Sequence, residues 1–324
     1  MNVIIIMKQY TFSIVIPTFK RKEVLSRTLR QLDIQKCNCD FEVIVINDGP
    51  AEELPELGFG KGTRANWRLI QNPHNLGRAA TRNRGIKEAT GEYVLMLDDD
   101  IWAVPGLVQA HYEKQKEIGG GVVVGAVPPA KEVEDTVWHR YIAARFARVH
   151  ARLRQQELDF GLFLTGNVSL PANVLKEAGG FDERFKEYSF EDSELGYRLK
   201  TKGVRFAHAP DAIGYHFFTE DLKKICAKAQ ESGRSQAVFV KIHPELFNFM
   251  GSHSLVIRWW KKSEIIKNTG KLVLFSFVGM ALSYRIAAIA GSLRMERIVF
   301  SSLPILEWQY KARGYGLGKK VVLT

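Results

Sequence analysis

The 324-residue sequence contains only three cysteines, Cys37, Cys39 and Cys226. Three cysteines are too few, and odd in number, for a disulfide framework, so we expect the protein to work in a reducing compartment. No second pair of cysteine or histidine residues stands near Cys37 and Cys39, which argues against a structural zinc site. The first 220 residues also lack internal repeats and low-complexity linkers, and we treat them as one domain.

Long apolar runs are scarce as well. The N-terminal stretch 3–7 is too short for a signal peptide or a membrane span, and we expect it to be a flap or an extension of the first strand. From residue 272 to 291 the chain is largely apolar, but Arg285 interrupts it. The uninterrupted runs are shorter than the ~20 residues that a membrane-crossing helix needs.

Positive charge is in excess, and the excess has one location. The whole chain carries 46 Lys and Arg against 35 Asp and Glu, a formal net charge of +11. Residues 1–220 contain 29 of each sign, whereas residues 221–324 contain 17 basic and 6 acidic residues. We therefore expect a body over 1–220 that carries out chemistry and a basic, apolar-rich helical region over 221–324 that meets an anionic surface.

Short apolar strands alternate with helical patterns through the first hundred residues. We expect strands at 12–16, 41–46, 68–71 and 93–97, and a helix at 79–89. This alternation predicts an α/β fold with a doubly wound, mostly parallel sheet flanked by helices. Further along, we expect a long helix within 133–158, a helix over 190–200 and a strand over 203–209.

Three consecutive acidic residues follow the fourth expected strand. Residues two apart in an extended chain face the same side, so Asp98 and Asp100 are expected to point together and Asp99 away. The carboxyl edge of a parallel sheet is where open α/β folds bind ligands, and paired carboxylates there suit Mg²⁺ or Mn²⁺. The alternative is an acidic strand-to-loop turn without a metal.

Two further features should lie at the same edge. Asp48 ends the second strand and can accept a hydrogen bond from a nucleobase, although an Asx-turn residue before Gly49 is the alternative. Arg78 and Arg82 begin a helix that approaches the edge, where arginine can clamp a diphosphate. Their alternative is a solvated basic helix face.

These motifs occur in an order that resembles the family 2 glycosyltransferases, which are inverting enzymes with a GT-A-type fold. The resemblance covers roughly residues 10–220 and rests on the segments 13–18, 45–49, 75–83, 91–100, 165–168, 179–182 and 190–195. It implies that Pro17, Thr18 and Asp48 contact the nucleoside, that Asp98 and Asp100 form a metal-binding DxD motif, and that Asp192 is the catalytic base. Relatives often carry an aromatic-Asn-Arg stretch where this chain has Phe19-Lys20-Arg21.

The chemistry agrees with a single carboxylate base. A diphosphate neutralised by a metal is already a good leaving group, so the protein must only deprotonate the acceptor hydroxyl. Glu191 and Glu194 compete with Asp192 for this role, and Asp192 can instead stabilise the first turn of a helix with Ser189 as its N-cap. His216, after the late strand, is a further metal candidate, with a structural histidine as its alternative.

For the C-terminal region we expect amphipathic helices on the cytoplasmic face of the membrane. Basic residues around the apolar stretch favour anionic lipid headgroups: Lys261, Lys262, Lys267, Lys271, Arg294 and Arg297. A helical subdomain packed on the body, a dimer contact and a spanning helix are the alternatives.

The sequence thus predicts a glycosyltransferase that uses Mg²⁺ or Mn²⁺ and a nucleoside-diphosphate sugar. Its acceptor would be the hydroxyl of a glycan or a lipid-linked molecule, in cell-surface polysaccharide or lipid-linked glycan biosynthesis at the inner face of the membrane. A sugar-1-phosphate nucleotidyltransferase is a second possibility, but residues 17–21 replace the glycine-rich phosphate loop that it should have. A nucleic-acid-binding protein is a third, but the basic surplus lies beside an apolar stretch and no nucleic-acid motif is present, so we expect no nucleic-acid partner.

Overall fold

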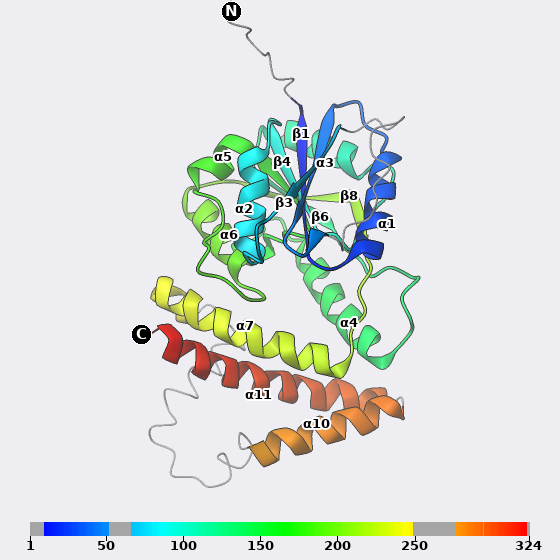
Figure 1. The fold of residues 1–324 in the computed structure, drawn as a ribbon, viewed down its shortest axis with the longest axis vertical. Coiled ribbons are helices and arrows are strands. Elements are labelled where there is room, and N and C mark those ends of the chain that lie inside the picture. The colour runs from blue at the N-terminus through cyan, green and yellow to red at the C-terminus, as the bar shows by residue number, and fades with distance from the viewer. Residues whose placement is uncertain (1–9, 52–65, 249–276, 294, 323–324) are drawn as a thin grey trace, which may run out of the picture. The chain divides into compact units, whose positions relative to one another are not determined.

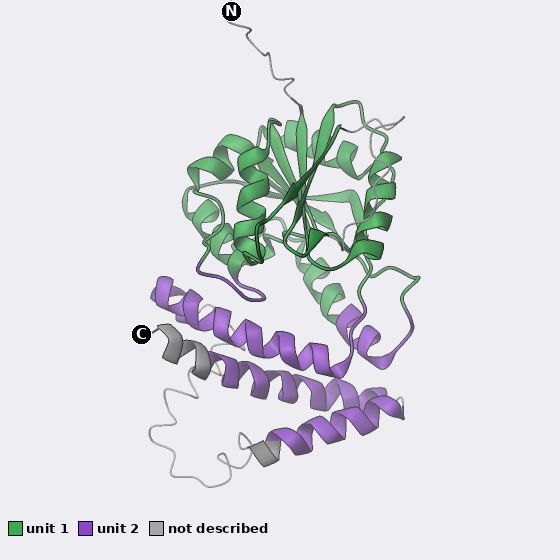
Figure 2. Ribbon diagram, viewed as in Figure 1, with its two compact units in different colours: residues 1–133, 145–183, 191–218 green, residues 134–144, 184–190, 219–324 purple. Residues whose placement is uncertain are grey.

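The computed structural model describes residues 10–51, 66–248, 277–293 and 295–322 (Figure 1). The expected N-terminal flap at 3–7 lies outside the described residues, as do Lys261, Lys262, Lys267, Lys271 and Arg294. The chain divides into two compact units, shown in Figure 2. Unit 1 comprises residues 1–133, 145–183 and 191–218, and unit 2 comprises residues 134–144, 184–190 and 219–324.

Unit 1 is built on an eight-stranded sheet in the order β3-β2-β1-β4-β7-β6-β8-β5. Its strands are β1 (Phe12–Thr18), β2 (Phe41–Asn47), β3 (Asn66–Gln71), β4 (Tyr93–Leu97), β5 (Ile101–Ala103), β6 (Val122–Ala126), β7 (Asn167–Pro171) and β8 (Phe206–His216). The pairs β1–β2, β1–β4, β2–β3 and β6–β8 are parallel, whereas β4–β7, β6–β7 and β5–β8 are antiparallel. The expected α/β fold with a mostly parallel sheet is confirmed.

Helices cover both faces of this sheet (Figure 1). The helices of unit 1 are α1 (Lys22–Asp33), α2 (Arg78–Glu88), α3 (Leu107–Ile118), α5 (Ala172–Glu177) and α6 (Glu191–Thr201). Helices α1 and α3 pack with Ile14 and Ile16 of β1 in one core, whereas α2, α5 and α6 pack with Val15 in the other. Alternate residues of one strand thus fill two different cores, as the two-residue period of a strand requires.

Two expected elements have different bounds in the structure. The helix predicted within 133–158 is α4 (Val137–Arg152), which begins at Val137 because the Thr136 hydroxyl accepts a hydrogen bond from the His139 amide at 3.1 Å. The strand predicted over 203–209 continues to His216, because β8 resumes its pairing with β6 beyond a register irregularity. Its second half also pairs with β5, a three-residue strand that the sequence analysis missed.

Unit 2 is helical. It contains α7 (Leu222–Ile242), α10 (Phe277–Ser292), α11 (Glu296–Val322) and the first part of α4. Val137 and Tyr141 of α4 share a hydrophobic core with residues from α7, α10 and α11. Within the described ranges, none of the helices combines the length and the apolar character that crossing a membrane requires.

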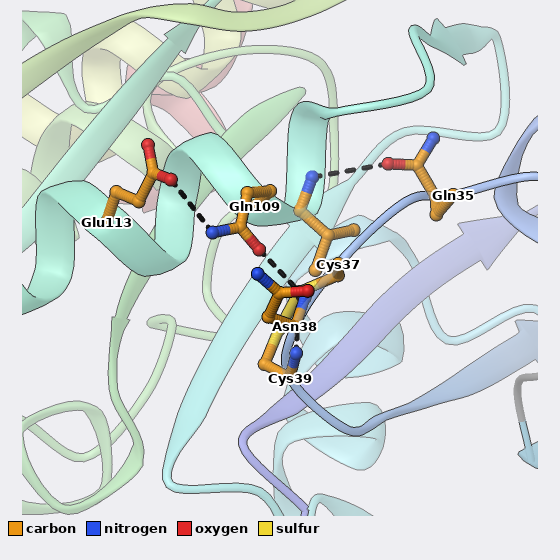
Figure 3. Close-up of a disulfide and its surroundings, with 7 residues drawn as sticks. Gln35, Cys37, Asn38, Cys39, Gln109 and Glu113 are labelled. Atoms are coloured by element: carbon orange, nitrogen blue, oxygen red, sulfur yellow. Dashed lines mark hydrogen bonds between the residues drawn. A yellow bond between two sulfur atoms is a disulfide. The ribbon is translucent and has the colours of Figure 1, made fainter.

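A disulfide joins Cys37 and Cys39 just after α1 (Figure 3). The amide of Asn38, between them, donates a hydrogen bond to Gln109 Oε1 of α3 at 2.9 Å. The number of cysteines argued against a framework of several disulfides. It carries no information about a bond between residues two apart. Cys226, buried in α7, is a free thiol.

Candidate active site

The three acidic residues after β4 form a turn and not a continuation of the strand. Strand β4 ends at Leu97, and the amide of Ile101 donates to the carbonyl of Asp98 at 3.2 Å. Arg21 Nη1 lies 3.0 Å from Asp99 Oδ1 and 2.5 Å from Asp100 Oδ2. The extended geometry from which Asp98 and Asp100 were expected to point together is therefore absent, and the turn instead brings Asp99 and Asp100 to one arginine.

Asp99 anchors this turn to the end of β1. Its carboxylate accepts a hydrogen bond from the Thr18 hydroxyl at 2.7 Å, and its carbonyl accepts one from the Thr28 hydroxyl of α1 at 2.7 Å. Burial and the neighbouring Asp100 raise the pKa of Asp99 to about 7. Thr18, a predicted nucleoside contact, thus has its hydroxyl engaged with the acidic turn.

The side chains of Asp100 and His216 lie close together. Their Oδ1 and Nε2 atoms are 3.4 Å apart, and pairing of β5 with β8 sets Ile101 opposite His216. Burial acts to raise the pKa of Asp100, but His216 and Arg21 outweigh it and hold that pKa well below its usual range. Asp100 Oδ1 is buried and has no hydrogen-bond partner among the described residues.

The predicted metal ligands therefore form a pair and not a triad. Nowhere in the described chain do three or more acidic, histidine or cysteine side chains converge closely enough to hold a metal ion. Asp100 and His216 still supply one carboxylate oxygen and one imidazole nitrogen, which suit Mg²⁺ or Mn²⁺. Asp100 Oδ1, which faces His216 at 3.4 Å, is the oxygen that would bind a cation between the two side chains.

Asp98 belongs to a second network, centred on Arg82. The Arg82 side chain is buried, and its Nη2 donates to Asp98 Oδ1 at 2.9 Å while its Nη1 donates to Glu191 Oε1 at 3.0 Å. Both terminal nitrogens are thus bound to protein carboxylates. The structure gives Arg82 a bridging role between the acidic turn and α6, and its contact with a diphosphate stays a prediction.

The first turn of α6 presents three carboxylates, and the structure distinguishes them. Glu191 is bound by Arg82, and Glu194 accepts two hydrogen bonds from Arg198 at 2.8 and 2.7 Å. Asp192 accepts from the Ser193 amide at 2.7 Å and, within the described residues, has no ion-pair partner. Burial and the adjacent Glu191 raise the pKa of Asp192 to about 7. A carboxyl group with a pKa near 7 can act as a general base at neutral pH.

Asp48 organises the loop that precedes α2. Its Oδ1 accepts from Asn72 Nδ2 and from the Leu76 amide, both at 2.8 Å, and its Oδ2 accepts from the Gly77 amide at 3.0 Å. A carboxylate has about four lone-pair positions, so one further donor can still bind. The expected nucleobase contact of Asp48 is compatible with this geometry.

The remaining predicted donor contacts lie close by in the fold. Pro17 and Thr18 end β1, and the amide of Asp48 donates to the carbonyl of Thr18 at 2.9 Å. Arg78 is the exposed first residue of α2, directly after Gly77, whose φ of 84° is in the left-handed region. The structure brings Pro17, Thr18, Asp48 and Asp98 to the carboxyl ends of adjacent strands β1, β2 and β4.

Sequence analysis missed two partners of these residues. Arg21 holds both Asp99 and Asp100, and Thr28 fixes the acidic turn from α1. Arg21 was visible only as the last residue of the stretch that replaces an aromatic-Asn-Arg motif. Thr28 gave no signal, because a threonine at a helical core position reads as packing.

Comparison with known proteins adds the family. The model of glycosyl transferase family 2 matches residues 13–170, and that of glycosyl transferase family group 2 matches residues 93–308. The chain belongs to the family 2 glycosyltransferases. The ordered motifs predicted this family.

Curated relatives share the sequence over the body of the chain. Identity is 29% over 234 residues with the chondroitin synthase of Escherichia coli, covering 63% of this chain and 34% of that protein. It is 30% over 228 residues with the validoxylamine A glucosyltransferase of Streptomyces hygroscopicus, covering 62% of this chain and 54% of that enzyme. The chain thus spans between a third and about half of the length of these two relatives.

Solved structures with the same architecture identify the fold as GT-A. The mannosyltransferase PcManGT from Pyrobaculum calidifontis, solved with GDP-Man and Mn²⁺, matches with a TM-score of 0.59 at 15% identity. That match covers 97% of this chain and 88% of PcManGT. S. aureus TarS 1–349 matches with a TM-score of 0.52 at 17% identity, covering 97% of this chain and 91% of TarS. The predicted GT-A-type fold is confirmed.

Proposed function

We propose that this glycosyltransferase transfers a sugar, with inversion and with the help of a divalent metal, from a nucleoside diphosphate to an acceptor hydroxyl. The observation that carries the proposal is Asp192. It is the carboxylate at the start of α6 that arginine does not bind, and its raised pKa of about 7 matches the task of a general base at neutral pH.

The donor site lies at the carboxyl ends of β1, β2 and β4. Pro17, Thr18 and Asp48 are assigned to the nucleoside, and Asp98 to the donor beside the metal site. Support comes from structural neighbours that were solved with nucleotides: TarS 1–349 with UDP-GlcNAc and PcManGT with GDP-Man. Arg78, exposed at the start of α2, is assigned to the diphosphate.

Asp100 and His216 are assigned to the metal, Mg²⁺ or Mn²⁺. A divalent ion bound there would neutralise the diphosphate and improve it as a leaving group. Phe146 and Phe218 support this assignment, because their ring centroids lie 5.1 and 4.9 Å from that of His216 and fix the imidazole. Arg21 forms an ion pair with the other oxygen of the Asp100 carboxylate, Oδ2.

In the reaction, Asp192 removes the proton of the acceptor hydroxyl as the hydroxyl oxygen bonds to the anomeric carbon. The bond from that carbon to the diphosphate oxygen breaks, and the nucleoside diphosphate leaves with the electron pair. Attack from the face opposite the leaving group inverts the anomeric centre. The ion pairs of Arg82 with Glu191 and Asp98 hold the α6 carboxylates beside the acidic turn.

We further propose that the acceptor is a glycan or a lipid-linked molecule at an anionic membrane surface, the cytoplasmic face of the cell membrane. Exposed apolar residues gather on α10, on α11 and between them, and we name this group the α10–α11 apolar face: Leu282, Ile286, Ile289, Leu293, Met295, Ile298 and Ile305. Arg285 and Arg297 are exposed within the same segment. Exposed apolar side chains with interspersed cations along α10 and α11 fit the interface of a bilayer that contains anionic lipids.

The first experiment measures nucleotide binding and donor turnover with UDP-, GDP- and dTDP-sugars, in the presence of Mn²⁺ or EDTA. We expect one nucleotide to bind in a metal-dependent way. Asp100→Ala should lose this metal-dependent nucleotide binding. Asp192→Asn should bind the donor normally but turn it over about 10³-fold more slowly.

Glu194→Gln is the matched control, because Glu194 stands two residues from Asp192 but is bound by Arg198. It should retain turnover within about threefold of the unaltered enzyme. Normal turnover by Asp192→Asn would refute the role of Asp192. If none of the nucleotide sugars binds with or without Mn²⁺, the proposed donor class is wrong.

A further inference from the structure

The segment that leads into α6 belongs to the C-terminal helical unit. Residues 184–190 are part of unit 2, together with α7 and α11, whereas unit 1 resumes at residue 191 (Figure 2). Only one residue, Glu191, separates Phe190 from Asp192. The chain therefore passes directly from unit 2 to the proposed base.

Aromatic packing fixes the end of this segment. Phe185, Phe190 and Phe239 of α7 form a buried cluster of their own, and the ring centroids of Phe190 and Phe239 are 5.4 Å apart. Lys311 of α11 places its Nζ 5.0 Å from the centroid of the Phe190 ring. Phe190 is thus held by both long helices of unit 2.

Polar contacts tie the same segment to α7. Arg234 forms an ion pair with Glu187, and Lys228 Nζ lies 5.5 Å from the centroid of the Tyr188 ring. Lys228 and Arg234 are six residues apart on α7, which is more than one helical turn. Together with the aromatic cluster they fix the segment along much of its length.

The backbone before α6 has a conformation that such contacts must maintain. Ser189 and Phe190 have φ angles of 76° and 75°, in the left-handed region that non-glycine residues rarely adopt. Two consecutive residues of this kind persist where the surroundings determine them. The next residue, Glu191, accepts a hydrogen bond from Arg82 of unit 1.

We propose that the C-terminal helical unit positions the catalytic base: Phe239 holds Phe190, and Phe190 sets the start of α6 and with it the Asp192 carboxylate. Phe190 and Phe239 are positioning residues, since neither is assigned to substrate. This inference rests on the proposed role of Asp192. It gives the basic C-terminal region a part in sugar transfer besides any contact with a membrane.

The test compares Phe239→Ala with Phe239→Leu and with Leu306→Ala in the full-length protein. Leu306 is a matched control, because it is fully buried in unit 2 but belongs to the separate core that α4, α7, α10 and α11 share. Two measurements are made on each variant: hydrogen–deuterium exchange of residues 191–195, and the kcat and KM for the nucleotide sugar that the donor panel identifies.

Phe239→Ala should speed exchange at 191–195 and lower kcat about tenfold, with the KM for the donor within about twofold of the parent value. Phe239→Leu should restore most of both, and Leu306→Ala should change neither. Unchanged exchange at 191–195, unchanged kcat, or the same effects in Leu306→Ala would each overturn the proposal. Asp192→Asn, measured alongside, separates the two ideas: if it keeps full turnover, the base assignment fails, whereas the exchange data still report whether Phe239 holds the start of α6.

Discussion

Unit 1 and unit 2 differ in what they bury and what they expose. Unit 1 buries charged side chains, with Arg82, Asp99, Asp100 and Glu191 all between 2% and 6% exposed. Unit 2 exposes hydrocarbon, since seven of the eleven exposed large hydrophobic residues of the described chain lie in 282–305. Either arrangement costs stability by itself, because charges lose water in the first and apolar groups contact water in the second.

The difference separates two tasks. The buried charges of unit 1 lie around the acidic turn and α6, where a preorganised site of low polarity would strengthen electrostatic interactions with the proposed nucleotide-sugar donor. The α10–α11 apolar face of unit 2 has no such chemistry, and its side chains suit a large apolar partner.

The largest effect is expected at Arg82. Arg82→Leu should remove about 3–5 kcal/mol of stability, because Asp98 and Glu191 would lose their cation while Glu191 remains buried. For a domain of this size the melting temperature should fall by roughly 10 °C, and donor turnover should be lost as well. Differential scanning calorimetry and turnover measurements check this.

Arg78→Leu is the control for Arg82→Leu, because Arg78 is exposed on the same helix. It should leave the melting temperature within about 2 °C and act on the KM for the donor. Equal melting temperatures for the two variants would contradict the bridging role of Arg82.

The next largest effect is expected at the α10–α11 apolar face. The triple change of Leu282, Ile286 and Ile289 to Ser should weaken binding to vesicles that contain phosphatidylglycerol by roughly 30- to 100-fold, because exposed apolar residues contribute to interfacial binding by area. Sedimentation with vesicles measures the affinity. The melting temperature should change little, since all three side chains are exposed.

Leu69→Ser is the control for this change, because Leu69 is also exposed but lies on β3 of unit 1. It should bind vesicles as the parent does. If the triple variant binds vesicles normally while remaining folded, the face serves another partner, and a change in oligomeric state on the same substitutions would identify a second copy of the chain.

Sequence reasoning predicted most of unit 1 because its signals are local. Apolar strands, the turn Asn47-Asp48-Gly49 and the ordered motifs predicted β1, β2 and β4 with small errors at their ends. Strand β5 was missed because it has only three residues and is defined by its pairing with β8. Such pairing depends on tertiary structure and leaves no periodicity in the sequence.

The sequence indicated which polar residues gather at one edge of the sheet but not how they pair, and their roles stay predictions. Asp98, Asp100, Asp192 and His216 all lie at or beside the acidic turn and α6, but the alternation rule does not describe residues 98–100, because β4 ends at Leu97. Charge pairing decides the arrangement, and no local pattern shows that Arg82 lies between Asp98 and Glu191, which is 109 positions away in the chain.

A smaller effect is expected of Asp192→Asn on the stability of the folded protein. Burial and Glu191 raise the pKa of Asp192 from 3.8 to about 7, so the folded state loses stability as the pH rises through this interval. Asp192→Asn carries no charge at any pH and avoids this loss. We expect the variant to be more stable than the parent by about 2 kcal/mol at pH 8.5, and by less at pH 5.

Urea unfolding at the two pH values measures this difference. The parent and the variant are compared at each pH, so that changes common to both proteins cancel. A stability difference that does not grow between pH 5 and pH 8.5 would mean that Asp192 has an ordinary pKa. The effect of burial on the pKa of Asp192 would then be absent.

The smallest effect is a shift of the pH profile in Glu191→Gln. Asp192 must be deprotonated to act as a base, so kcat should rise with pH through its pKa of about 7. Glu191 raises that pKa, whereas Arg82 lowers it and Asp98 raises it. Replacing Glu191 with Gln removes the adjacent negative charge and leaves more of the Arg82 charge uncompensated, and both changes favour the ionised form of Asp192.

The acidic limb of the kcat profile should therefore move to lower pH by about one unit in Glu191→Gln. Glu194→Gln should move it far less, because Arg198 already neutralises Glu194. A limb that stays in place in Glu191→Gln, or moves equally in both variants, would assign it to a group other than Asp192. The buried charges of unit 1 would then stabilise the structure of the site without shifting the pKa of Asp192.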